Sequence, residues 1–176
     1  ASALTQTLDL KLYSEIIMTR VTVPVGEDIG FLPGTEEEKM APWMGALEDN
    51  LDVLNKTDEN AGDWGRAATQ DLIRSRVKIK SLNFMRGRTF LKKFLIIDEA
   101  QNLTPKQMKT LVTRAGPGTK VICLGNLAQI DTPYLTEGSS GLSFVVDRMK
   151  GWAHAGHITL ARGERSRLAD FAAESL

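Results

Sequence analysis

Apolar runs of strand length alternate along this chain with stretches of helical periodicity. The runs typical of strands lie at residues 15–19, 77–81, 94–97, 121–124 and 157–160. The helical stretches lie at residues 1–11, 35–54, 67–75, 105–115 and 141–150, and a last one begins near residue 166. Strands that alternate with helices predict an α/β protein, whose parallel sheet is flanked by helices.

Turn-forming residues mark the boundaries of several of these stretches. The loop Val21–Gly34 holds three glycines and two prolines, which favour a fixed irregular path over an extension of either neighbour. Residues 55–65, NKTDENAGDWG, are polar and rich in turn formers, so we expect a mobile surface loop there. Pro105 directly after Thr104 predicts a helix start with Thr104 as its cap.

The composition is that of one soluble globular domain, which we expect to cover residues 1–176, with 42% apolar and 25% charged residues. A single cysteine, Cys123, excludes an internal disulfide framework and is expected to be a buried thiol. His154 and His157 lack the spacing of zinc ligands. No apolar stretch approaches the roughly 18 residues of a membrane span, and no secretion signal is visible, which predicts a cytoplasmic protein.

The charges balance overall but are separated along the chain. Lys plus Arg number 22 and Asp plus Glu number 22, so the net charge of zero excludes a uniformly basic coat for nucleic acid. Residues 27–63 carry eleven acidic and two basic side chains, a net charge of −9. Residues 66–93 carry nine basic and one acidic, a net charge of +8. Opposite fields are therefore expected on adjoining segments.

The strongest chemical signal is FLIIDEAQ, at residues 94–101. Four apolar residues predict a strand buried on both faces, and Asp98 and Glu99 follow at its carboxyl end, where ligands bind in open α/β sheets. This is the pattern of a Walker B element. Hydrolysis of a nucleoside triphosphate needs one carboxylate that holds Mg²⁺, usually through water, and one that activates the attacking water, roles that suit Asp98 and Glu99 respectively. The alternative is that the two carboxylates only end a strand and cap the helix near Thr104.

Two further motifs place polar residues where phosphates would lie. The segment KVICLGNLAQID, residues 120–131, releases Asn126 and Gln129 after an apolar strand, and an amide there can sense a γ-phosphate without adding charge. Arg165 and Arg167 follow the last predicted strand, in GERSRLADFA, and an arginine aimed at a phosphate stabilises the charge that develops in phosphoryl transfer. The alternatives are an ordinary turn at Gly125-Asn126 and a solvated helix face.

The phosphate cradle G-x-x-x-x-G-K-[ST] of P-loop enzymes is missing from these 176 residues. The first residues read as the end of a helix, so we expect the first strand and the Walker A loop upstream of Ala1. The chain as given is then an N-terminally incomplete domain and is expected to be inactive by itself.

Taken together, these motifs resemble the PhoH-like family of P-loop ATPases, in particular its longer members, in which a PIN-type ribonuclease domain precedes the ATPase. The resembling blocks include TRVTVPVGEDIGFLPGTEEEKMAPWMGALEDNLDVL, RGRTF, FLIIDEAQNLTPKQMKTLVTRAGPGTK, GNLAQIDTPYL, GLSFVVDR and HITLARGERSRLADFA. The resemblance implies a RecA-like core that binds ATP and Mg²⁺ and hydrolyses ATP, with a link to RNA unwinding. It also implies a homo-oligomeric ring, with a hexamer as the expected form.

Roles for individual residues follow from the resemblance. Asp98 and Glu99 would be the Walker B pair, Gln129 the helicase-motif glutamine near the γ-phosphate, and Arg165 the arginine of the GERS block. Thr19 and Arg20 would belong to the helicase motif after the first crossover. Many members read Gly-Asp where this chain has Gly125-Asn126, so a third carboxylate is absent here.

Two classes of function compete. The favoured one is an ATP-hydrolysing, helicase-like RNA-remodelling domain, and the other is a non-catalytic RNA-binding or assembly module with the same fold. An unrelated α/β hydrolase is disfavoured because no G-x-S-x-G nucleophile elbow is present. Single-stranded RNA is the expected partner, held by a basic track of Arg76, Lys78, Lys80, Arg86 and Arg88. The alternative for that track is solvated charge, or pairing with the acidic helix at 35–54.

Overall fold

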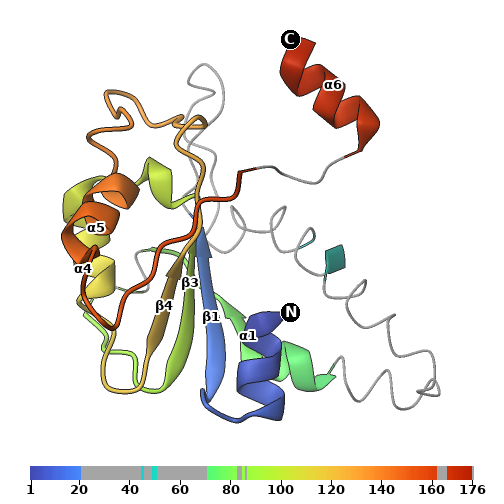
Figure 1. Cartoon of the computed structure of the whole chain (residues 1–176). Coiled ribbons are helices and arrows are strands. Elements are labelled where there is room, and N and C mark those ends of the chain that lie inside the picture. The colour runs from blue at the N-terminus through green and yellow to red at the C-terminus, as the bar shows by residue number, and fades with distance from the viewer. Residues whose placement is uncertain are drawn as a thin grey trace, which may run out of the picture. The chain divides into compact units, whose positions relative to one another are not determined.

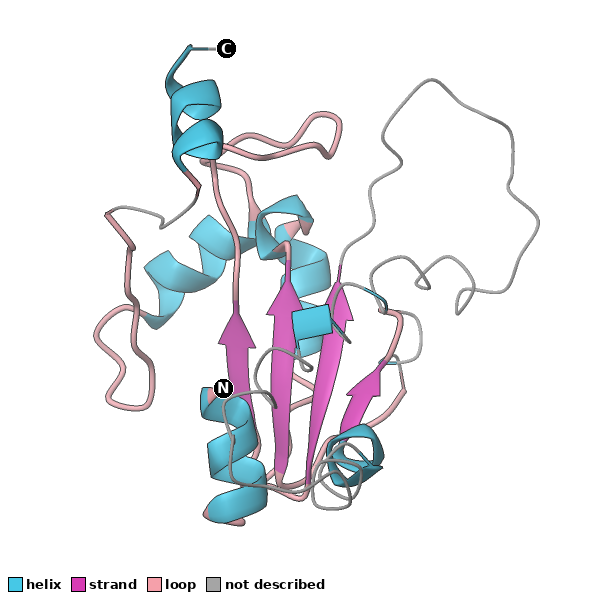
Figure 2. Ribbon diagram, turned by 90° about the vertical axis from the view of Figure 1, so that its right-hand side faces the viewer, coloured by secondary structure: helices cyan, strands magenta, loops and turns pink. Residues whose placement is uncertain are grey.

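A four-stranded parallel sheet forms the centre of the protein. The computed structural model describes residues 1–20, 45, 49–50, 71–82, 85, 87–161 and 166–175. The strands are β1 (Glu15–Arg20), β2 (Val77–Ile79), β3 (Lys93–Asp98) and β4 (Lys120–Cys123), paired in the order β2-β1-β3-β4. All three pairings are parallel, so every strand ends at the same edge of the sheet (Figure 2). The predicted fold class, a parallel sheet flanked by helices, is confirmed.

Strand β3 is buried on both faces, as its continuous apolar run predicts. Leu95 and Ile97 have no exposed surface, and Phe94, which points to the opposite face, is 4% exposed. The register places Leu95 opposite Ile17 of β1 and opposite Val121 of β4. Apolar neighbours on either side therefore enclose the central strand along its length.

Two helices cover one face of the sheet. Helix α4 (Pro105–Val112) begins with a capping box, because the Thr104 side chain accepts from the Gln107 amide and the Gln107 side chain accepts from the Thr104 amide. Helix α5 (Gly141–Met149) lies beside it (Figure 1). Met108 and Leu111 of α4 share one apolar core with the sheet residues Leu95 and Ile97. The predicted helix at 105–115 and its cap are confirmed.

The opposite face is covered near the start of the strands. Helix α1 (Ser2–Leu4), the π-helical turn Thr5–Asp9 and the helical residues 71–76 lie on this side (Figure 1). The Tyr13 ring meets the Phe94 ring edge to face, with 5.2 Å between their centres. Lys93 at the start of β3 pairs with Glu15 at the start of β1, at 2.9 Å between Nζ and Oε1. This end of the sheet is therefore closed by packing and by an ion pair.

The described residues divide into two compact units, Ala1–Val145 and Val146–Leu176. The second unit contains helix α6 (Arg167–Ser175), which begins one residue after the start predicted near residue 166. The strand predicted at residues 157–160 is wrong: these residues pair with no described strand, and Ile158 and Leu160 are each 83% exposed. An apolar run forms a strand only when a neighbouring edge supplies its hydrogen bonds, and no described strand does so here.

Several predictions from the sequence fall outside the described residues. These are the irregular loop at 21–34, nearly all of the acidic helix at 35–54 and the surface loop at 55–65. Among the helices that the structure describes, none has the length and apolar character needed to cross a membrane.

Gly141, the first residue of α5, lies against the backbone that follows the turn after β3, which makes it a test of this packing. A Cβ atom at position 141 would lie 2.7 Å from the Leu103 carbonyl oxygen and 2.8 Å from that of Thr104. Because backbone atoms cannot yield as a flexible side chain can, we expect Gly141→Ala to lower the free energy of unfolding by about 1 to 3 kcal/mol. Urea unfolding measures this loss. Gly138→Ala is the matched control, since no atom lies within 4 Å of its Cβ position, and an equal loss there would contradict the packing argument.

Candidate active site

Two carboxylates lie at the carboxyl end of β3, where the chain turns sharply away from the sheet. Asp98 is the last residue of the strand. Glu99 adopts a left-handed backbone conformation, with φ 52° and ψ 37°, and the 3-10 turn Ala100–Asn102 follows. This conformation costs a non-glycine residue of the order of 1 kcal/mol and is typical of functional positions. The Ala100 amide donates to the Leu124 carbonyl at 2.8 Å, which ties the turn to the end of β4.

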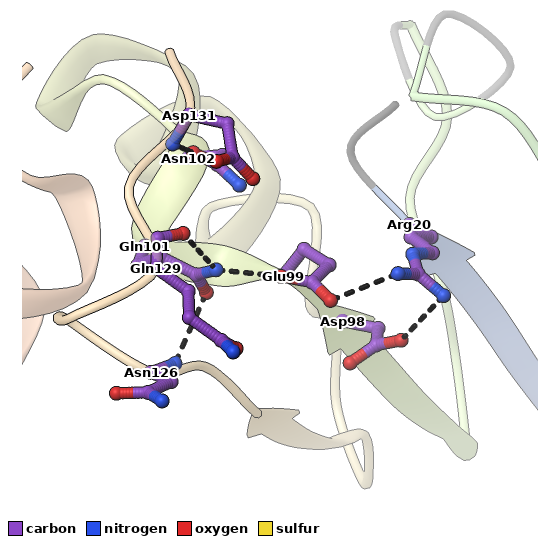
Figure 3. A network of polar contacts seen from close by, with 8 residues as sticks. All are labelled: Arg20, Asp98, Glu99, Gln101, Asn102, Asn126, Gln129 and Asp131. Atoms are coloured by element: carbon purple, nitrogen blue, oxygen red, sulfur yellow. Dashed lines mark hydrogen bonds and ion pairs between the residues drawn. The ribbon is translucent and has the colours of Figure 1, made fainter. Parts of the chain in front are cut away.

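Arg20, the last residue of β1, faces both carboxylates (Figure 3). Its Nη2 lies 2.9 Å from Glu99 Oε1, and its Nη1 lies 3.9 Å from Asp98 Oδ2. The parallel register sets this arrangement, because it aligns Arg20 with Asp98 across the two strands. All three side chains are partly exposed, so the guanidinium balances two acidic groups at a site that solvent and ligands can reach.

Burial raises the pKa of the Asp98 carboxyl above its ordinary value of 3.8. A backbone hydrogen bond from Glu99 and the positive charge of Arg20 act in the opposite direction, and the neighbouring Glu99 carboxylate adds to the increase. The ionised form of Asp98 is therefore less stable here than in water.

A buried glutamine joins this acidic pair to the loop after β4. The Gln101 side chain has no exposed surface, and its Nε2 donates to Glu99 Oε2 at 2.5 Å and to the Gln129 carbonyl at 2.9 Å. Its Oε1 accepts from the Asn126 amide at 3.2 Å. Figure 3 shows the Gln101 amide lying between Glu99 and the loop. Gln101 was not among the residues predicted for the site, although it lies only two residues after Glu99 in DEAQ.

The same loop is held a second time by Asn102. Its Oδ1 accepts from the amides of Asp131 and Thr132 at 2.8 and 3.1 Å. Gly125 lets the loop start close to the turn, because a Cβ there would lie 2.5 Å from Gln101 Oε1 and 2.9 Å from Leu142 Cδ2. We call residues 125–132 the sensor loop and residues 98–102 the Walker B turn, after the roles predicted for them from the sequence. The sensor loop is thus attached to the Walker B turn through its own backbone.

The structure brings the predicted sensor residues to the same edge of the sheet as the carboxylates. Asn126 and Gln129 both lie in the sensor loop, and both are exposed. The Asn126 side-chain oxygen accepts from the Ala128 amide at 3.1 Å, which forms a local turn. The Gln129 contact to Gln101 uses its backbone carbonyl, so the Gln129 amide group is not involved in it.

The residues predicted for nucleic acid lie in several environments. Thr19 is completely buried, so its side chain does not reach the surface, while Arg20 contacts the Walker B carboxylates instead. Arg76 donates to the Ser14 carbonyl at 2.8 Å, beside the edge strand β2, which contains Lys78. Lys80 follows β2, and Arg88 lies in the segment that leads to β3. Arg86 and Arg165 lie outside the described residues. Arg167 is the first residue of α6, in the second unit.

The donor chemistry of this site fits a magnesium ion. Mg²⁺ prefers oxygen ligands, keeps several waters and is usually held by one or two carboxylates together with phosphate oxygens. In the part of the chain that the structure describes, no group of three or more His, Cys, Asp or Glu side chains could enclose a metal. Asp98 and Glu99 therefore fit an ion shared with water and phosphate, and not one enclosed by protein ligands.

Parallel strands that end together, with an acidic pair on the central one, define an α/β protein of the P-loop NTPase type. The family model described as PhoH-like protein matches residues 1–171. The chain belongs to the PhoH-like family, which is a family of P-loop ATPases.

Curated relatives agree with this membership. Protein PhoH2 of Bacillus subtilis (strain 168) is 44% identical over 176 residues, which is 100% of this chain and 39% of that protein. The PhoH-like protein of the same strain is 42% identical over 139 residues, 78% of this chain and 40% of that protein. Protein PhoH2 of Mycolicibacterium smegmatis is 33% identical over 171 residues, 96% of this chain and 37% of that protein. The chain thus spans about two fifths of the length of these relatives.

The raised pKa of Asp98 makes a prediction about stability. Asp98→Asn removes a charge that burial disfavours, so we expect the free energy of unfolding at pH 7 to rise by about 0.5 to 2 kcal/mol. The gain should shrink as the pH falls through the folded-state pKa and be absent below 3.8, where the carboxyl is protonated in both folded and unfolded chains. Urea unfolding between pH 3.5 and 8 measures this dependence on pH. Asp71→Asn, at an exposed position, is the control, and a loss of stability in Asp98→Asn would contradict the argument.

Proposed function

We propose that this domain hydrolyses ATP and uses the reaction to remodel RNA, as the motor part of a longer protein. The observation that carries the proposal is the Walker B turn: Asp98 and Glu99 project from the end of a buried strand, and Glu99 is held in a left-handed conformation. A scaffold has no need for two adjacent carboxylates at this edge, one of them disfavoured by burial. Membership of a P-loop ATPase family supports the same conclusion.

The roles of the two carboxylates follow from their surroundings. Asp98 would hold Mg²⁺ through water, and the ion when bound would offset the negative charge of the phosphates. Glu99 would accept a proton from the attacking water. Arg20 and Gln101 each engage one of its carboxylate oxygens, and each oxygen keeps a second lone pair for that proton.

The remaining phosphate contacts would come from three other places. Asn126 and Gln129 would approach the γ-phosphate and its attacking water from the sensor loop. Arg165 and Arg167 would supply positive charge, from the same chain or from a neighbouring subunit of a homo-oligomer such as a hexamer. The phosphate cradle itself would lie upstream of Ala1, where a PIN-type ribonuclease domain would also be placed.

Glu99→Gln tests the assignment of the base in a protein that extends upstream through a phosphate-binding loop. The amide matches the carboxylate in size but cannot take the proton, so we expect turnover to fall by about 100-fold or more while ATP binding is kept. Steady-state hydrolysis and nucleotide affinity are the measurements. Glu137→Gln makes the same chemical change at an exposed position and should leave turnover unchanged.

The outcomes separate the two classes of function. If turnover in Glu99→Gln stays within about twofold of wild type, which is under about 0.5 kcal/mol of barrier, Glu99 is not the base. If the extended wild-type protein binds RNA but hydrolyses no ATP, the domain is a binding or assembly module instead.

The RNA part of the proposal predicts a dependence on salt. A basic track of about four phosphate contacts gives a slope near −3 when the logarithm of affinity for single-stranded RNA is plotted against the logarithm of salt concentration, at about 0.7 per phosphate. Replacing Lys78 and Lys80 with Ala should reduce the steepness of that slope by about 1.4 and weaken binding to all sequences alike. Fluorescence anisotropy across a salt series measures both. As a control, replacing Lys106 and Lys109 with Ala removes the same amount of charge from α4. If this control changes the slope as much as the Lys78 and Lys80 variant does, RNA does not follow the basic track.

A further inference from the structure

We propose that Gln101 is a positioning residue: its side-chain amide links the Glu99 carboxylate to the backbone of the sensor loop and thereby fixes the orientation of that carboxylate. The inference rests on the proposed role of Glu99 as base. Its basis is a single buried side-chain amide that bonds to both partners at once, to Glu99 Oε2 on one side and to Asn126 and Gln129 on the other.

The chemistry of the partners allows the Gln101 amide only one orientation. The Glu99 carboxylate and the Gln129 carbonyl can only accept hydrogen bonds, so both must face the NH₂ group. The Asn126 amide can only donate, so it must face the carbonyl oxygen. Turning the amide over would therefore break all three hydrogen bonds.

The surroundings of Gln101 leave it no freedom to exchange these partners for water. The side chain has no exposed surface, and its backbone carbonyl accepts from Ser140 Oγ at 2.9 Å. Gly125 packs against Oε1 so closely that a Cβ would lie 2.5 Å away. A polar group buried to this extent is costly when it loses a partner, so the bridge acts as a unit.

The consequence is a mechanical connection between sensing and catalysis. Asn126 and Gln129 carry the side chains proposed to meet the γ-phosphate, and their backbone is bound to the group that holds the base. A shift of the sensor loop must move the Gln101 amide, and with it one oxygen of Glu99. Because Arg20 holds the other oxygen, a movement of the Gln101 amide rotates the Glu99 carboxylate about that contact.

Gln101→Met tests the bridge in the chain itself, since it keeps the length of the side chain and removes all three hydrogen bonds. We expect the Asn126 amide to exchange its hydrogen at least about tenfold faster. The Leu124 amide, bonded to the Ile97 carbonyl, and the Asp131 amide, bonded to Asn102, should keep their rates and so show that the fold is intact. Gln107→Met, which removes an amide from the α4 capping box, is the matched control and should leave Asn126 unchanged.

A pair of variants tests the bond to Glu99 without any need for activity. If Gln101 and Glu99 interact, Gln101→Met and Glu99→Ala together should lower the melting temperature by less than the sum of their separate effects. Strictly additive changes in melting temperature, or an unchanged exchange rate at Asn126, would overturn the proposal.

Turnover in the extended protein then tests the positioning role. Gln101→Met should lower kcat by about tenfold or more with little change in KM, because the site still binds ATP but no longer orients its base. Gln101→Glu keeps an acceptor for Asn126 but places a carboxyl against Glu99, and either repulsion or a shared proton would remove Glu99 as a base. This variant should therefore lose kcat while Asn126 exchanges slowly, and wild-type kcat in both variants would overturn the role. An extended wild-type protein without ATPase activity would defeat the proposed function alone, with exchange and melting still deciding the bridge.

Discussion

The burial of β3 on both faces is the constraint on which the site depends. Leu95 and Ile97 fill the core beneath α4 and α5, and Phe94 packs beneath the N-terminal segment on the other face. The strand can emerge only at its carboxyl end, and the first two residues to do so are carboxylates. Apolar packing along β3 therefore places the two carboxylates at the edge of the sheet where the neighbouring strands also end.

Electrostatics at this edge are balanced by few groups. Asp98 is disfavoured as an anion by its burial, and Arg20 is the described cation within 4 Å of both carboxylates. The other contacts come from neutral amides, which hold oxygens in place and leave the charge of the site unchanged. Two carboxylates and one guanidinium leave this edge of the sheet with a net negative charge.

The sequence predicted the parts of the fold whose cause is local. The continuous apolar run before Asp98 and the Thr104-Pro105 signal each correspond to an observed element, β3 and α4. Residues 157–160 show the limit, because an apolar run does not reveal whether an edge is free to pair with it. The contacts of Arg20 and Gln101 also escaped prediction. They depend on how β1 and the sensor loop align with the Walker B turn, which is a property of the register and not of any one segment.

The ion pair between Arg20 and Glu99 joins residues 79 positions apart in the chain. Parallel strands so distant in sequence find each other slowly, because the loop between them must close before any contact rewards the closure. During synthesis, β1 leaves the ribosome long before β3 does, and the sensor loop follows later still. The contacts of Arg20 with Asp98 and Glu99 can therefore form only after β3 has been synthesised, and those of Gln101 with the sensor loop only after that loop has followed.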